Sequence, residues 1–257
     1  ITKMQMDALE GTSRLVNVPG RGMMQYYAQN DPVWAKMVYE PKGTTTYRPF
    51  GQGGCGPTSM AMAIANLVPM ESMGGISAYA RTESGFTFCR CSVNRYYCDR
   101  THAQYKLTTA WEFKHYLPVV LANFATGNNS WNEKSRTENR GTGTAFMLRA
   151  AEAYGLEFTV SKSGEEAIAA LKRGAMVVAS TGGTESPFTG GGHYLTLAHA
   201  DNTYLYIMDP YLKSDYSKTD KRHLLTQIQP GLLRARVEDM DQLLLYTFYI
   251  VENPMLR

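Results

Sequence analysis

Residues 51–68 constrain the fold more than any other part of the sequence. Three glycines and one glutamine precede Cys55, a composition that suits neither the interior of a helix nor that of a strand. After Cys55, Pro57 suits the first turn of a helix, and from residue 60 onward only Asn66 is polar. A helix that is apolar nearly all round is buried. We therefore expect a central buried helix that Pro69 stops, with Cys55 at its N-terminus behind an open glycine loop.

A cysteine in this position is a candidate nucleophile. The unpaired backbone N–H groups and the positive end of the helix dipole favour the thiolate, which is the reactive form. The alternative interpretation of Cys55 is a small buried side chain beside a turn.

The composition is that of an ordinary globular protein. The chain has 257 residues, of which 44% are hydrophobic and 19% are charged. The formal net charge of +3 is too small to indicate a nucleic-acid partner, and no apolar run is long enough to span a membrane. We expect a single domain covering residues 1–257, monomeric, with residues 1–23 as an N-terminal extension.

The hydrophobic pattern predicts helices early in the chain and paired strands late. This order predicts an α+β fold with helices packed on a mostly antiparallel sheet. The expected helices are 6–15, 55–68, 75–82, 109–117, 144–154, 163–173 and 223–228, and the expected strands are 23–29, 156–161, 175–181, 193–200, 203–208 and 243–251.

A nucleophilic thiol needs a base and a group that orients the base. His193 begins a predicted strand, after a loop of residues 182–192 that holds five glycines and is expected to be mobile and to border a groove. Asp209 ends the adjoining strand. A lone histidine at a strand end is more often structural, but Cys55, His193 and Asp209 together indicate catalysis. The remaining histidines fit this role less well: His102, His115, His199 and His223.

The register of the two strands can also be predicted. A three-residue loop of residues 200–202 would place His193 directly opposite Asp209. The same register gathers four aliphatic side chains on one face of the hairpin: Leu195, Leu197, Leu205 and Ile207. A slip of one residue would mix the two faces, so we predict the three-residue loop.

Three short motifs resemble those of the papain-like cysteine peptidases. The chain is most similar to the bacteriocin-leader (double-glycine) peptidases and their stand-alone bacterial relatives, the C39-like peptidases. The similarity covers residues 24–212 and includes the upstream segment Tyr27–Trp34. The motifs are Gly54-Cys55-Gly56-Pro57-Thr58-Ser59-Met60, Gly192-His193-Tyr194 and Asp209-Pro210.

This resemblance implies a papain-like fold and hydrolysis of peptide bonds in a peptide or protein substrate, without a cofactor. Cys55 would be the nucleophile, His193 the general base and Asp209 the residue that orients it. The resemblance favours Gln29 as the side chain that stabilises the oxyanion, and Gln52 is the alternative because it lies closer to Cys55 in the sequence.

Other functions are compatible with the same residues. A papain-like amidase or an acyl- or aminoacyl-transferase uses the same triad on a cell-wall peptide or isopeptide, and a non-catalytic module would only bind a peptide. The chain does not begin with Met, so we expect an upstream segment that has either been removed or is not part of this sequence. With the family resemblance, this predicts an extracellular or cell-surface location in a bacterium.

Residues 83–106 form a cysteine-rich insert that departs from the family pattern. Three interpretations stay open: a disulfide such as Cys89–Cys98, a zinc site, or three free thiols. The zinc ligands would be Cys89, Cys91, Cys98 and His102.

Overall fold

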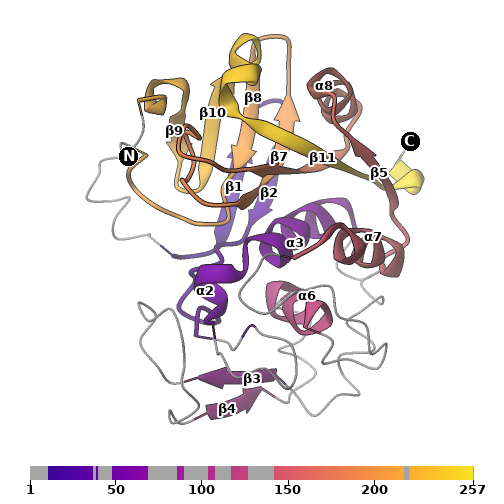
Figure 1. The fold of residues 1–257 in the computed structure, drawn as a ribbon. Coiled ribbons are helices and arrows are strands. Elements are labelled where there is room, and N and C mark those ends of the chain that lie inside the picture. The colour runs from indigo at the N-terminus through magenta and orange to yellow at the C-terminus, as the bar shows by residue number, and fades with distance from the viewer. Residues whose placement is uncertain are drawn as a thin grey trace.

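A seven-stranded antiparallel sheet forms the centre of the computed structural model (Figure 1). The structure describes residues 11–36, 39, 48–68, 86–89, 104–107, 117–126, 142–216 and 220–256, with the backbone alone for 86–89 and 104–107. The strands follow the order β5 (Glu157–Ser161), β11 (Leu245–Glu252), β6 (Met176–Thr181), β7 (His193–Ala200), β8 (Tyr204–Met208), β10 (Leu232–Arg236) and β9 (Thr226–Gln229). The predicted α+β class is confirmed.

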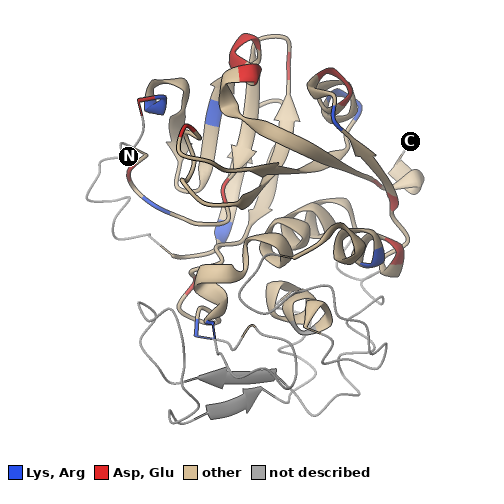
Figure 2. Ribbon diagram, viewed as in Figure 1, with Lys and Arg blue, Asp and Glu red and all other residues tan. Residues whose placement is uncertain are grey.

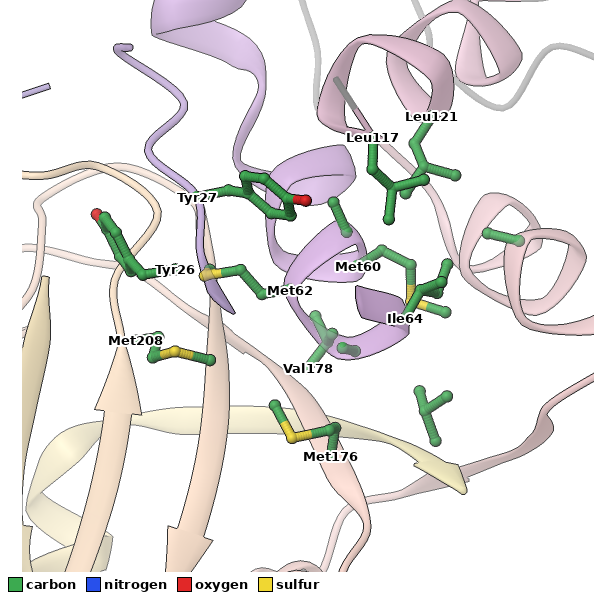
Figure 3. Close-up of a cluster of buried hydrophobic side chains, with 14 of the residues drawn as sticks. Tyr26, Tyr27, Met60, Met62, Ile64, Leu117, Leu121, Met176, Val178 and Met208 are labelled. Atoms are coloured by element: carbon green, nitrogen blue, oxygen red, sulfur yellow. The ribbon is translucent and has the colours of Figure 1, made fainter. Parts of the chain in front are cut away.

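Both faces of this sheet are buried. On one face lie α3 (Cys55–Leu67), α6 (Leu117–Ala125) and α7 (Thr144–Ala153), and on the other lie α8 (Gly164–Lys172) and the 3₁₀-helix η3 (Val237–Leu243). In β6, Met176 and Val178 point to the first layer, while Val177 and Ala179 point to the second. Figure 3 shows the first layer, which includes methionines of α3 and of the sheet. The continuous apolar run of β6 follows from this double burial.

The central helix α3 begins at Cys55, as the sequence predicts. Pro57 lies in its first turn, and the helix ends at Leu67 with Val68 in an extended conformation. Neither α3 nor α6 carries a charged residue (Figure 2). This composition suits α3, which packs between the sheet and α6 (Figure 1).

The glycines before Cys55 form a helical turn, contrary to the prediction of an open loop. This turn is α2 (Phe50–Gly53), and its glycines are buried. A Cβ on Gly51 would lie 3.0 Å from the Cβ of Ala35, and one on Gly54 would lie 2.5 Å from the Phe50 ring. These glycines therefore serve close packing inside the fold rather than access by a substrate.

An N-terminal hairpin of β1 (Arg14–Val18) and β2 (Gly22–Tyr26) packs beside the sheet. The expected helix 6–15 is wrong for residues 11–15, because 11–13 are not helical and 14 and 15 belong to β1. Its residues before 11 lie outside the described residues. The Arg21 guanidinium donates to three backbone carbonyls of the sheet side: Gly174, Ala175 and Ala198. These bonds attach the tip of the hairpin to the sheet.

The other expected elements are found with small shifts in their ends, with two exceptions. α6 begins at Leu117 with Pro118 in its first turn, and residues 109–116 of the helix expected at 109–117 lie outside the described residues. The helix expected at 223–228 is instead the short 3₁₀-helix η2 (Arg222–Leu224) followed by β9. The remaining elements are the pair β3 (Phe86–Cys89) and β4 (Gln104–Leu107) and the 3₁₀-helix η4 (Pro254–Leu256). The expected helix 75–82 lies outside the described residues. Among the described helices, none has the length and apolar character needed to cross a membrane.

The β7–β8 hairpin has the predicted faces but not the predicted register. Asp201 donates its N–H to the Tyr204 carbonyl, so the tip has two residues rather than three. A β-bulge at Ala198 then shifts the pairing, so that Leu197 opposes Ile207. The four aliphatic side chains still share one layer: Leu195, Leu197, Leu205 and Ile207. The predicted pairing of His193 with Asp209 is wrong, because β8 ends at Met208 opposite Thr196.

Candidate active site

The Cys55 thiol lies at the first residue of α3 and is half-buried. It is a free thiol and forms a hydrogen bond with the His193 side chain. Two backbone N–H groups also point at the sulfur, those of Gly56 and Tyr194. One comes from the start of α3 and the other from the start of β7, so the sulfur lies where the helix meets the sheet.

The His193 side chain lies between Cys55 and Asp209. Its Nε2 is 2.8 Å from Oδ1 of Asp209, which leaves Nδ1 as the ring nitrogen available to Cys55. The side chain of His193 is 8% exposed and that of Asp209 is 0% exposed. The three side chains that the sequence predicts as a triad are therefore adjacent in the structure, although their strands do not pair directly.

The Asp209 carboxylate accepts three hydrogen bonds. Besides the His193 ring, Oδ1 accepts from the Tyr211 N–H at 2.9 Å, and Oδ2 accepts from the Tyr216 hydroxyl at 2.7 Å. The backbone is held as well, because the Tyr26 hydroxyl donates to the Asp209 carbonyl. A buried carboxylate needs such partners, since leaving it unpaired is costly.

The electrostatics of the site favour a thiolate and an imidazolium. Burial raises the pKa of Cys55. The hydrogen bond and charge of His193 and the two backbone N–H groups lower this pKa by more than burial raises it, so the pKa falls below the usual 9.0. Burial lowers the pKa of His193, but the charge and hydrogen bond of Asp209, together with Cys55, raise it to about 9. Burial raises the pKa of Asp209, but the charge of His193 outweighs this and lowers it.

Comparison with known protein families agrees with this geometry. Residues 23–228 match the Peptidase C39-like family. The chain belongs to this family. It is a family of peptidases, and the matched range contains α3, β7 and the end of β8, so it includes Cys55, His193 and Asp209. No curated protein matches the chain.

Gln29, the predicted oxyanion donor of this C39-like chain, is buried between two segments of the site. Its N–H donates to the Pro210 carbonyl, and its side-chain Nε2 donates to the Gly51 carbonyl at 3.1 Å. Nε2 carries a second hydrogen that this bond does not use. Gln52, the alternative, lies within α2. Among the described residues, the buried Oε1 atoms of Gln29 and Gln52 both lack a hydrogen-bond partner. The choice between the two amides stays a prediction.

The glycine-rich loop before His193 is held by several hydrogen bonds. The Ser186 hydroxyl bonds with the Thr181 hydroxyl and accepts the Phe188 N–H, and both Ser186 and Phe188 are buried. Gly190, Gly191 and Gly192 are exposed next to His193, and no atom of the described residues lies within 4 Å of an added Cβ. The exposed end of the loop therefore borders the site, whereas its middle is part of the core.

Sequence reasoning missed three tyrosines that hold the site. Tyr26 and Tyr216 donate to Asp209, and Tyr194 points its N–H at Cys55. Tyr194 and Tyr26 lie in strands whose alternation could have shown which way they point. Tyr216 lies in an irregular segment, where no periodicity identifies a partner.

The predicted zinc site cannot be placed. Cys91, Cys98 and His102 lie outside the described residues, and only the backbone of Cys89 is described, in β3. Within the described ranges, no group of three His, Cys, Asp or Glu side chains could hold a metal ion. A disulfide, a zinc site and free thiols all stay predictions for the insert.

Proposed function

We propose that this protein is a cysteine peptidase that hydrolyses peptide bonds through a triad of Cys55, His193 and Asp209. The observation that carries the proposal is the position of the His193 ring, which bonds with Cys55 on one side and with buried Asp209 on the other. Membership of a peptidase family supports the same reaction class.

In the proposed reaction, the Cys55 thiolate attacks the carbonyl carbon of the scissile bond. The negative charge moves to the carbonyl oxygen, where the Cys55 N–H and the free hydrogen of Gln29 Nε2 stabilise it. The His193 imidazolium then gives its proton to the leaving amine, and a thioester forms on Cys55. His193, now neutral, takes a proton from water, which attacks the thioester and releases the carboxylate product.

Replacing triad residues tests this proposal directly. Cys55→Ala and His193→Ala should each lower kcat/KM on a peptide library by at least about a thousandfold, because both groups act in the bond-breaking steps. His199→Ala is the matched control, since His199 lies on the same strand but stacks on Tyr206. Circular dichroism checks that each variant is folded. Wild-type rates from either triad variant would refute the proposal.

Asp209→Asn should lower kcat/KM by a factor roughly a hundredfold smaller than the factor for Cys55→Ala, because Asp209 orients the base but does not transfer the proton. An effect as large as that of Cys55→Ala would contradict this role. The same assay would detect transfer to an added amine in place of hydrolysis, which would identify a transferase.

Labelling with iodoacetamide separates the enzyme from a non-catalytic peptide-binding module. An activated Cys55 should be alkylated at neutral pH well before the other three cysteines. Equal rates for all four would favour the binding module. The bacterial extracellular location and the monomeric state stay predictions of the sequence.

A further inference from the structure

The second oxygen of the Asp209 carboxylate has a partner that the triad does not explain. Oδ1 faces His193, while Oδ2 accepts the hydroxyl of Tyr216 at 2.7 Å. Asp209 is fully buried, so Oδ2 has no access to water. Without Tyr216, a charged oxygen would lose this hydrogen bond in the interior, and the carboxylate could rotate more easily.

Tyr216 is itself fixed from the other side by Lys213. The Lys213 ammonium lies 4.4 Å from the centroid of the Tyr216 ring, and it donates to the Phe188 carbonyl. Phe188 belongs to the glycine-rich loop that leads into His193 and is only 2% exposed. The segment after Asp209 and the loop before His193 are thus joined at Lys213 and Tyr216.

We propose that Tyr216 is a further positioning residue of this site, which holds the Asp209 carboxylate with Oδ1 toward His193 and draws part of its negative charge toward Oδ2. This proposal rests on the triad proposed above. The consequence concerns the acid strength of the imidazolium. A carboxylate whose charge is shared among several donors stabilises the His193 cation less, so the cation gives its proton to the leaving amine more readily.

Within the part of the chain that the structure describes, four titratable groups face Asp209 from the elements packed around it. His193 of β7 and Tyr216 bond with its carboxylate, Lys213 acts on it by charge, and Tyr26 of β2 donates to its carbonyl. Cys55 faces the other side of His193. Tyr216→Phe removes one hydroxyl from this set and keeps the ring beneath Lys213. The charge of Asp209 would then act more strongly on His193.

The test is the rate of Cys55 alkylation by iodoacetamide between pH 5 and pH 10.5, with the label located by mass spectrometry. In the full chain, the alkaline step reports the loss of the His193 proton. We expect Tyr216→Phe to move this step upward on the order of half a pH unit. Tyr246→Phe is the matched control, because its hydroxyl donates to the Gly182 carbonyl and touches none of the three triad side chains. The alkaline step of Tyr246→Phe should occur at the same pH as that of the wild type.

A second variant, Lys213→Met, removes the nearby positive charge and keeps an unbranched side chain of similar length. It should move the alkaline step in the same direction, and it tests the proposal if Tyr216→Phe fails to fold. A step that stays in place or moves down in the folded variants would overturn the role of Tyr216 while leaving the triad intact. A wild-type profile with a single ordinary thiol titration would refute the triad and the role of Tyr216 together.

Discussion

At the scale of single residues, the site depends on two side chains that each favour the charged form of the other. His193 lowers the pKa of Cys55, while Asp209 and Cys55 raise the pKa of His193. The thiolate and the imidazolium therefore coexist between these two pKa values. In the proposed reaction, Cys55 is therefore charged before a substrate binds, and His193 already carries the proton that the leaving amine needs.

This pairing predicts a bell-shaped dependence of kcat/KM on pH. Activity should rise as Cys55 loses its proton, and it should fall as the pH passes the pKa of His193, about 9. In Asp209→Asn the alkaline limb should move to lower pH, because the charge of Asp209 raises the pKa of His193. Rates measured on one peptide from pH 4 to pH 10.5 check both points. A wild-type rate that keeps rising beyond pH 10 would contradict the ion pair.

The three residues of the proposed triad, which the structure brings together, could be selected from the sequence because each lies in a short motif at the end of an element. Cys55 starts the apolar helix, His193 follows a glycine run, and Asp209 precedes a proline. Tyr216 could not be predicted in the same way, since it lies in an irregular segment seven residues beyond Asp209. Its role depends on a chain path that only the structure shows.

At the scale of elements, hydrophobic alternation predicts faces better than it predicts pairing. Leu195 and Leu197 share a layer with Ile207 as expected. The two-residue tip alone would have reversed the side-chain alternation, and the bulge at Ala198 restores it. On the tip side of the bulge, His199 pairs with Tyr206, and their ring centroids are 6.3 Å apart.

The hairpin of β9 and β10 could not be predicted, because residues 226–229 lack an apolar alternation. Their structural role lies in the turn that follows. Gly231 has a φ of +85°, and its carbonyl accepts the Asp209 N–H. A Cβ on Gly231 would lie 2.4 Å from the ring of Tyr26, whose hydroxyl holds the Asp209 carbonyl. The hairpin thus supports the site from beneath Asp209.

Gly231→Ala should therefore reduce both stability and activity. Gly155→Ala is the matched control, because Gly155 has a φ of +70° and an added Cβ would have no described atom within 4 Å. In Gly155→Ala, the strain of an alanine in the left-handed conformation should lower the free energy of unfolding by about 1 kcal/mol and leave kcat/KM unchanged. Gly231→Ala should lose roughly 2 kcal/mol more, because the Tyr26 ring must move. Urea unfolding and peptide hydrolysis measure the two effects, and equal losses in both variants would contradict the contact with Tyr26.

At the scale of the whole molecule, one sheet separates two hydrophobic layers and belongs to both. α3 packs on one face of β6 and β7, and α8 packs on the other. The candidate active site lies at the edge of the first layer, where α3 begins, while Asp209 and Phe188 connect it to segments that border the second. Because the strands are shared, neither layer can lose its packing without exposing the sheet between them.

This sharing predicts that the two layers unfold together. Ile64 of α3 and Leu171 of α8 are both 0% exposed, one in each layer. Ile64→Ala and Leu171→Ala should each lower the free energy of unfolding by about 2–5 kcal/mol. In each variant, far-ultraviolet and near-ultraviolet circular dichroism should show a single unfolding transition at the same urea concentration, and this concentration should be lower than in the wild type. Val160→Ala, at a half-exposed position of the edge strand β5, should have only a small effect. Two separate transitions, each moved by only one of the buried substitutions, would show that the layers are independent units and would contradict the single domain predicted from the sequence.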